Sequence, residues 1–157
     1  MLKIEQVFEP ILTGSARPKI LKDFPMVHVQ PVQWGDMDGF NHLNNVAYYR
    51  YAESARISYL RAVGLLLARA DLMTILASSS CQYLRPVVYP DTLLIGVRVK
   101  HLGTTSLIFD YQFISHDQQA LVATGEAVIV RATEDGVKKP WSDDERALIA
   151  AFEGSAQ

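Results

Sequence analysis

The chain of 157 residues has one cysteine, Cys81, so it cannot form an internal disulfide. It also lacks an excess of charge, since 15 lysines and arginines stand against 17 aspartates and glutamates. Without a clustered basic surface, nucleic acid is not expected as a partner. No hydrophobic run approaches the ~18 residues of a membrane span, and residues 1–5 lack the features of a secretory signal. We therefore predict a cytoplasmic protein without a membrane span.

The length fits one domain, because domains contain roughly 100–200 residues. Residues 1–25 contain several prolines and no sustained hydrophobic period, which predicts a loose N-terminal arm with a short helix near 5–11. We assign residues 26–157 to a single domain. Neither a nucleophile elbow nor a phosphate or dinucleotide loop is present in the sequence.

Alternation of apolar and polar residues predicts a strand from Met26 to Trp34, at an edge or bulged at Pro31. A long helix over 46–63 follows, with Asn44 or Asn45 as its N-cap and Gly64 as its stop. Its apolar surface is wide, so we expect the helix to be mostly covered. Further strands are predicted over 73–84, 91–101, 105–116 and 120–132, and Ser142 with Glu145 begins a short C-terminal helix.

These elements predict an α+β fold in which the long helix is wrapped by a five-stranded antiparallel sheet. The strands follow one another through short turns, and short turns require antiparallel pairing. Such a sheet covers one side of the helix. A second subunit is therefore expected to extend the sheet or to pack on it.

The stretch Trp34–Asn45 is the candidate for chemistry, because it places two carboxylates and a histidine before the helix. Asp38 lies near the helix start, where free N–H groups and the helix dipole favour an ionised carboxylate. Such a carboxylate can serve as a general base or a nucleophile. Backbone N–H groups around Asn45 can stabilise an oxyanion. Together these groups predict an acyl-transfer hydrolysis site.

Other interpretations of the loop compete with this one. Asp, Asn and Gly before a helix are also ordinary turn and cap residues. A calcium EF-hand is excluded, because a ligand loop starting at Asp36 would have Ala47 where a bidentate Glu is needed. Asp36, Asp38 and His42 supply three candidate metal ligands without a fourth nearby, so we predict no metal and no other cofactor. Cys81 is interpreted as an inert thiol, and Glu53 as the partner of Arg56 or Arg50.

Several spaced motifs resemble the hotdog-fold acyl-CoA thioesterases of the 4-hydroxybenzoyl-CoA thioesterase type. The motifs are Trp34-Gly35-Asp36-Met37-Asp38, Asn41-His42-Leu43-Asn44-Asn45, Tyr48 to Arg56, Tyr83-Leu84-Arg85-Pro86-Val87, Asp91-Thr92-Leu93 and Leu102 to Ser106. The resemblance covers roughly residues 26–132. It implies a dimer with a continuous sheet and active sites at the subunit interface.

The resemblance also implies residue roles. The catalytic carboxylate falls on Asp38, and the amide that polarises the thioester carbonyl is the backbone N–H of Asn45. Asp36, His42 and Asn44 match positions that shape the loop, and Asn41 stands where relatives often have Gly. The turn at Thr104 and Thr105 lacks the basic residues that contact coenzyme A phosphates in some members, for which Arg85, Arg98 and Lys100 are candidate substitutes.

We therefore expect hydrolysis of an acyl thioester, carried by coenzyme A or by an acyl carrier protein, in a homodimer or a dimer of dimers. Candidate substrate-binding residues are Asn44, Tyr48, Arg85, Lys100, Thr104 and Thr105. Tyrosines of the helix fit an aromatic or an aliphatic acyl group equally. The alternative is a non-catalytic module that binds acyl-CoA or acyl carrier protein in the same groove.

Overall fold

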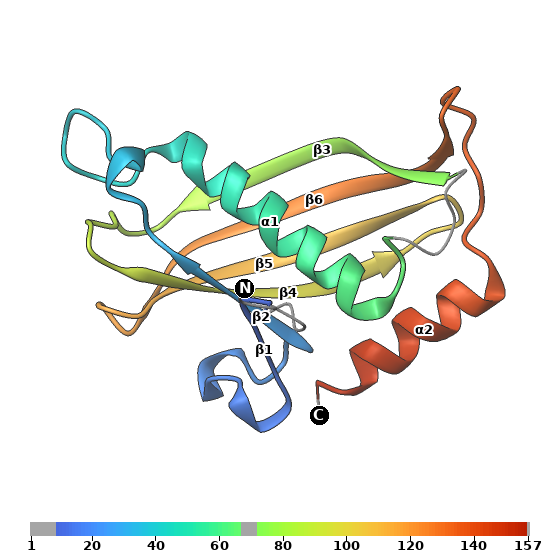
Figure 1. The fold of residues 1–157 in the computed structure, drawn as a ribbon, viewed down its shortest axis with the longest axis horizontal. Coiled ribbons are helices and arrows are strands. Elements are labelled where there is room, and N and C mark those ends of the chain that lie inside the picture. The colour runs from blue at the N-terminus through green and yellow to red at the C-terminus, as the bar shows by residue number, and fades with distance from the viewer. Residues whose placement is uncertain (1–8, 67–71, 157) are drawn as a thin grey trace, which may run out of the picture.

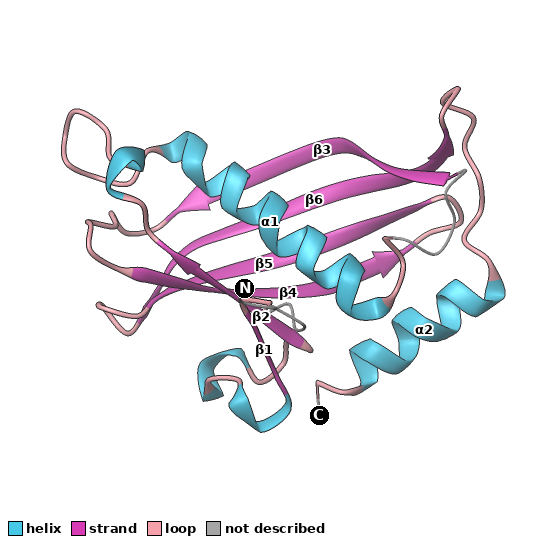
Figure 2. Ribbon diagram, in the orientation of Figure 1, coloured by secondary structure: helices cyan, strands magenta, loops and turns pink. Residues whose placement is uncertain are grey.

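The computed structural model describes residues 9–66 and 72–156. It contains one six-stranded antiparallel sheet in the order β1-β2-β4-β5-β6-β3, and the long helix α1 crosses one face of it (Figures 1 and 2). The strands are β1 (Ile11–Thr13), β2 (Met26–Pro31), β3 (Leu72–Tyr83), β4 (Thr92–Leu102), β5 (Ser106–Ser115) and β6 (Ala120–Thr133). The predicted α+β class is confirmed.

The sheet has six strands where the sequence predicted five, because the N-terminal arm adds β1 beside β2. The arm expected to be loose is thus structured from residue 9 onward, and Ile11, placed at the end of a predicted helix, lies in a strand. Residues 5–8 of that predicted helix lie outside the described part of the chain. Leu21 and Phe24 are buried on the face of the sheet away from α1, where Gly96 leaves them room. Burial of these two side chains holds the arm in place.

Helix α1 (Asn45–Val63) begins and ends where the sequence places its caps. The side chain of Asn44 accepts a hydrogen bond from the N–H of Val46, so Asn44 is the N-cap rather than Asn45. Gly64 closes the helix in the left-handed conformation with φ of 84°. Both ends are therefore encoded locally.

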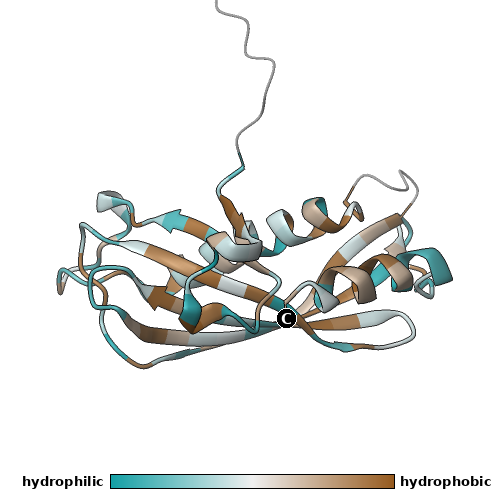
Figure 3. Cartoon of the chain, turned by 90° about the horizontal axis from the view of Figure 1, so that it is seen from below, coloured by the Kyte–Doolittle hydropathy of each residue, from teal (hydrophilic) through white to brown (hydrophobic). Residues whose placement is uncertain are grey.

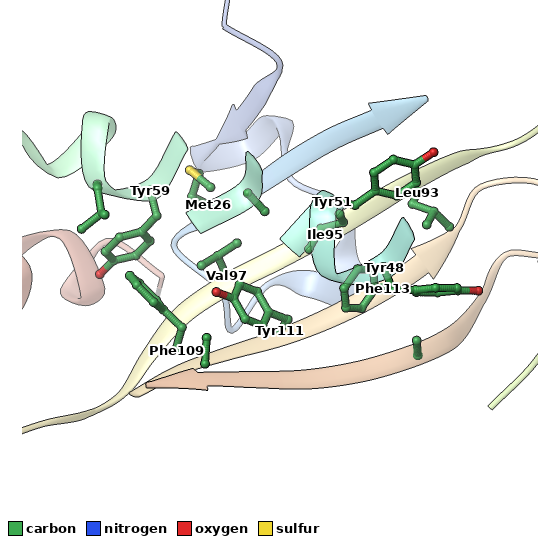
Figure 4. Packing of buried hydrophobic residues seen from close by; sticks show 14 of the residues in the cluster. Met26, Tyr48, Tyr51, Tyr59, Leu93, Ile95, Val97, Phe109, Tyr111 and Phe113 are labelled. Atoms are coloured by element: carbon green, nitrogen blue, oxygen red, sulfur yellow. The ribbon is translucent and has the colours of Figure 1, made fainter. Parts of the chain in front are cut away.

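The core lies between α1 and the sheet. Along the strands, hydrophobic and hydrophilic residues alternate (Figure 3), and one set faces the helix. Tyr59 of α1 packs edge-to-face on Phe109 of β5, with ring centroids 5.1 Å apart (Figure 4). The sequence predicts that α1 is mostly covered, but within one chain it is only partly covered, since Val46, Tyr49 and Ile57 remain exposed on one side of it.

The C-terminal helix α2 (Asp143–Gly154) lies at the far end of α1 from the loop that precedes α1 (Figure 1). The predicted capping box is confirmed, because the N–H of Glu145 donates to Ser142 Oγ. Glu145 also pairs with Arg131 of β6 in a buried contact of 2.8 Å. Glu153 Oε1 accepts bonds from the Tyr59 hydroxyl and the N–H of Val99. These contacts fix α2 to α1 and the sheet.

Candidate active site

The loop between β2 and α1 is closed by its own backbone. Strand β2 stops at Pro31, before the predicted end at Trp34, and a 3-10 turn at Trp34–Asp36 follows it. The N–H of Asp38 then donates to the carbonyl of His42 at 2.7 Å, and Asn41 has a φ of 60°. Asn41 therefore adopts the left-handed conformation, which Asn tolerates better than most residues other than Gly.

Asp38 uses one carboxylate oxygen to hold this loop. Its Oδ1 accepts hydrogen bonds from the N–H groups of Phe40 at 2.8 Å and His42 at 3.1 Å. Its Oδ2 has no hydrogen-bond partner among the residues that the structure describes. Asp38 is partly buried and lines an open cavity of about 420 Å³. One oxygen is therefore structural, and the other is available to a ligand.

Asp36 has a different position and a different partner. Its Oδ2 accepts a hydrogen bond of 2.6 Å from the hydroxyl of Tyr51, and that hydroxyl also accepts from the N–H of Gln33. Burial, followed by the bond to Asp36, raises the pKa of Tyr51 to about 12, so the hydroxyl stays protonated and keeps donating. Asp36 is thus tied to α1 and anchors the loop.

The start of α1 contributes a free N–H group to the same cavity. The N–H groups of Val46 and Ala47 are bonded to Asn44, through its side chain and its carbonyl respectively. Within the described residues, the N–H of Asn45 has no acceptor. Asn45 lines the cavity together with Asp38. A helix N-terminus carries partial positive charge, so this N–H is suited to an anionic oxygen.

We call this space the loop cavity, and its lining includes Asp38, His42, Asn45, Tyr48, Tyr83 and Arg85. Tyr83 is part of a motif noted in the sequence but was not predicted as a site residue, although the period of two along β3 places it on the face towards α1. Its hydroxyl donates to the carbonyl of Asn45 at 2.9 Å, and its ring packs edge-to-face on Tyr48. Tyr83 therefore helps to hold the helix start.

A second cavity of about 240 Å³ follows along the seam between α1 and β3, and Tyr48 lines both. We call it the inner cavity. Its walls include Ala52, Arg56, Cys81, Tyr111, Phe113 and Ala127. The rings of Tyr48, Tyr111 and Phe113 are shown in Figure 4. Arg56 and Tyr111 were not predicted as site residues, because the contact between α1 and β5 that unites them is long-range.

The remaining predicted binding residues lie elsewhere. Thr104 and Thr105 form the β4–β5 turn, whose carbonyl groups accept bonds from Trp141 and Arg131 near α2. Lys100 pairs with Glu126 on the sheet face away from α1. One chain therefore places Tyr48 and Arg85 in one cavity with Asp38 and keeps Asn44 as the N-cap of α1, whereas Lys100, Thr104 and Thr105 lie elsewhere.

Two interpretations of acidic residues can be compared with the geometry. Arg56 is the partner of Glu53, at 3.6 Å, which confirms one of the two pairings expected for Glu53. Among the described residues, no group of three or more His, Cys, Asp and Glu side chains is arranged to hold a metal ion. Within those same limits, no helix is long and apolar enough to cross a membrane.

The sequence profile of the thioesterase-like superfamily matches residues 32–149, which include the loop, α1 and all strands from β3 to β6. The chain belongs to the thioesterase-like superfamily. As a member of this superfamily it is a thioester hydrolase, and the predicted hotdog fold is confirmed.

Individual proteins resemble the chain over most of its length. YsmA of Bacillus subtilis is 33% identical over 119 residues, which are 75% of this chain and 80% of that protein. A thioesterase from Thermus thermophilus, solved in complex with coenzyme A and Zn, is 30% identical with a TM-score of 0.73, covering 84% of this chain and 97% of the other. A thioesterase superfamily protein from Jannaschia sp. CCS1 is 25% identical with a TM-score of 0.76, covering 83% and 84%.

Proposed function

We propose that the protein hydrolyses acyl-CoA thioesters in the loop cavity, with Asp38 as the catalytic carboxylate. The observation that carries this proposal is that Asp38 and the free N–H of Asn45 line one cavity. The solved complex of the related Thermus thioesterase with coenzyme A supports the choice of carrier. In this arrangement the oxygen of the thioester carbonyl accepts a hydrogen bond from the backbone N–H of Asn45, and the carbonyl carbon faces Asp38.

Two routes use the same groups. As a general base, Asp38 takes a proton from water while the hydroxide adds to the carbonyl carbon. The C–S bond then breaks, and Asp38 returns the proton to the sulfur, which leaves as the thiol. As a nucleophile, Asp38 forms an anhydride and expels the thiolate, and water then releases the acid. In both routes negative charge develops on the carbonyl oxygen beside Asn45. Repeated turnover in ¹⁸O-water followed by mass spectrometry supports the nucleophilic route if the Asp38 side chain gains label, because only attack of water on the Asp38 side of the anhydride introduces it.

Asp38→Asn tests the role of the carboxylate. The amide retains an oxygen that can accept from Phe40 and His42, so the loop is expected to fold, while basicity and nucleophilicity are lost. We expect kcat/KM on a panel of acyl-CoAs to fall at least ~10²-fold. Asp23→Asn, the same change at an exposed position, serves as the control and is expected to have wild-type rates. Equal rates for Asp38→Asn and wild type would refute the assignment, and binding without turnover by the wild type would favour a non-catalytic acyl-binding module.

We further propose that the active unit contains two chains paired through β3. This strand forms one edge of the sheet and has no charged residue in its twelve positions. Met73, Ile75 and Leu76 are 40–45% exposed on it, beside the exposed apolar residues of α1. Unprotected edge strands pair readily, and a strand can pair with its own copy about a two-fold axis.

Such pairing would bring the distant binding residues to the active site. When β3 pairs antiparallel with its copy, the β4–β5 turn of the copy lies at the same end of the double sheet as Asp38. The partner's Thr104 and the partner's Thr105 are then candidates to contact coenzyme A alongside Arg85. Light scattering coupled to size exclusion tests the pairing. Ile75→Lys, which places a charge on the exposed edge, is expected to give monomers and to lower activity.

A further inference from the structure

The inner cavity has a charged group at one end, and a plain hydrocarbon acyl group would have no polar atom to contact it. Arg56 is 7% exposed, yet its guanidinium lies in the cavity wall. Within the described residues its polar contacts are the Tyr111 hydroxyl at 3.4 Å and Glu53 at 3.6 Å. Both distances exceed the 2.7–3.2 Å of ordinary N–H···O hydrogen bonds. Arg56 thus has five N–H donors and no close acceptor.

The charge of Arg56 is also poorly compensated. Among the described residues, its one carboxylate partner is Glu53, whose side chain is 64% exposed, so solvent screens their attraction. A buried charge is costly unless it is paired and hydrogen-bonded. Tyr111, which is 1% exposed, directs its hydroxyl to the same place, and its O–H has no acceptor among the described residues. Two buried donors therefore converge on one point of the cavity.

The other walls of the inner cavity suit a hydrocarbon chain. Gly125 and Ala127 of β6 have small side chains or none, which leaves space in the cavity. Ala52, Cys81 and Phe113 are apolar or weakly polar. The inner cavity adjoins the loop cavity, because Tyr48 lines both spaces. The end opposite to Asp38 is where Arg56 and Tyr111 lie.

We propose that the inner cavity binds acyl groups that carry a carboxylate at the end remote from the thioester, with Arg56 and Tyr111 as its donors. Arg56 lies about 16 Å beyond Asn45 along the helix axis, at a rise of 1.5 Å per residue, and helical side chains point back towards the N-terminus. The acyl chain must therefore be several carbons long. This inference rests on the proposed hydrolysis of acyl-CoA and specifies its substrate class.

Pairs of acyl-CoAs of equal chain length test the inference, from glutaryl and pentanoyl up to suberoyl and octanoyl. For at least one length, the wild type is expected to have the higher kcat/KM on the carboxylated member. In Arg56→Gln the ratio of the two kcat/KM values is expected to fall about 10- to 100-fold, the effect of losing a hydrogen bond between charged groups. Tyr111→Phe, which keeps the buried ring, is expected to lower the ratio less. Arg61→Gln, at an exposed arginine of the same helix, is the control and should keep the wild-type ratio.

Binding to Asp38→Asn separates this inference from the proposed catalysis. Calorimetry is expected to show tighter binding of the carboxylated acyl-CoA, and weaker binding once Arg56→Gln is added. Preference for the plain acyl group at every length, or an unchanged ratio in both Arg56→Gln and Tyr111→Phe, would overturn the inference while leaving the hydrolysis intact. If Asp38→Asn retains full turnover, the catalytic assignment fails, but the ratio of kcat/KM values in Arg56→Gln still decides the role of Arg56.

Discussion

The buried pair between Arg131 of β6 and Glu145 of α2 allows the sharpest prediction about stability. The side chains are 3% and 7% exposed, and the Arg131 Nη2 to Glu145 Oε1 distance is 2.8 Å. The Arg131 guanidinium also lies over the ring of Trp141, 5.1 Å from its centroid. Glu145→Gln removes the negative charge from one partner of this buried cation. Removing one member of a buried ion pair costs about 3–5 kcal/mol.

For a chain of this length each kcal/mol corresponds to about 2–4 °C in Tm, so Glu145→Gln should lower Tm by roughly 6–20 °C. Differential scanning calorimetry measures this shift. The double variant Arg131→Met with Glu145→Leu should recover most of the loss, because replacing both charges by apolar groups of similar volume is often neutral or stabilising. A shift below about 3 °C for Glu145→Gln would refute the argument that this pair is effectively desolvated.

Three further predictions concern a cap, a histidine and a glycine. Asn44→Ala removes the N-cap of α1 and should lower the free energy of unfolding by about 1 kcal/mol in urea titration, while Asn44→Asp should lower it less. Burial lowers the pKa of His28, which is hydrogen-bonded to Ser58, so the unfolded chain binds the proton more readily than the folded chain. The free energy of unfolding should therefore be highest above pH about 6.5 and decrease below it, by at most about 1.4 kcal/mol per pH unit. His28→Asn should flatten this pH dependence. Gly96→Ala should cost about 1–3 kcal/mol, since a Cβ there would lie 2.8 Å from Phe24 Cγ; unchanged thermal stability would show that Phe24 moves freely.

Much of the architecture could be predicted because the signals are local. Alternation along β4 and β5 follows from the period of two of a pleated strand, and the ends of α1 follow from Asn44 and Gly64, whose conformations are decided within one turn. The loop motif likewise indicated Asp38 and the start of α1, where they lie in one cavity. Strand β1 could not be predicted, because its three residues between Pro10 and Gly14 are too few to show a hydrophobic period.

The sequence by itself thus determined the class of fold, the helix that carries the site and the loop with its two aspartates. It also indicated Asp38 for chemistry and Asp36 for shaping the loop. Only the tertiary structure decided their contacts: the partner of Asp36 is Tyr51 on α1, whereas one oxygen of Asp38 has no hydrogen-bond partner among the described residues. It also decided that Arg56 and Tyr111, 55 residues apart, meet in a buried cavity. Contacts of this kind depend on packing between elements distant along the chain, and hydrophobic periodicity within each element does not encode them.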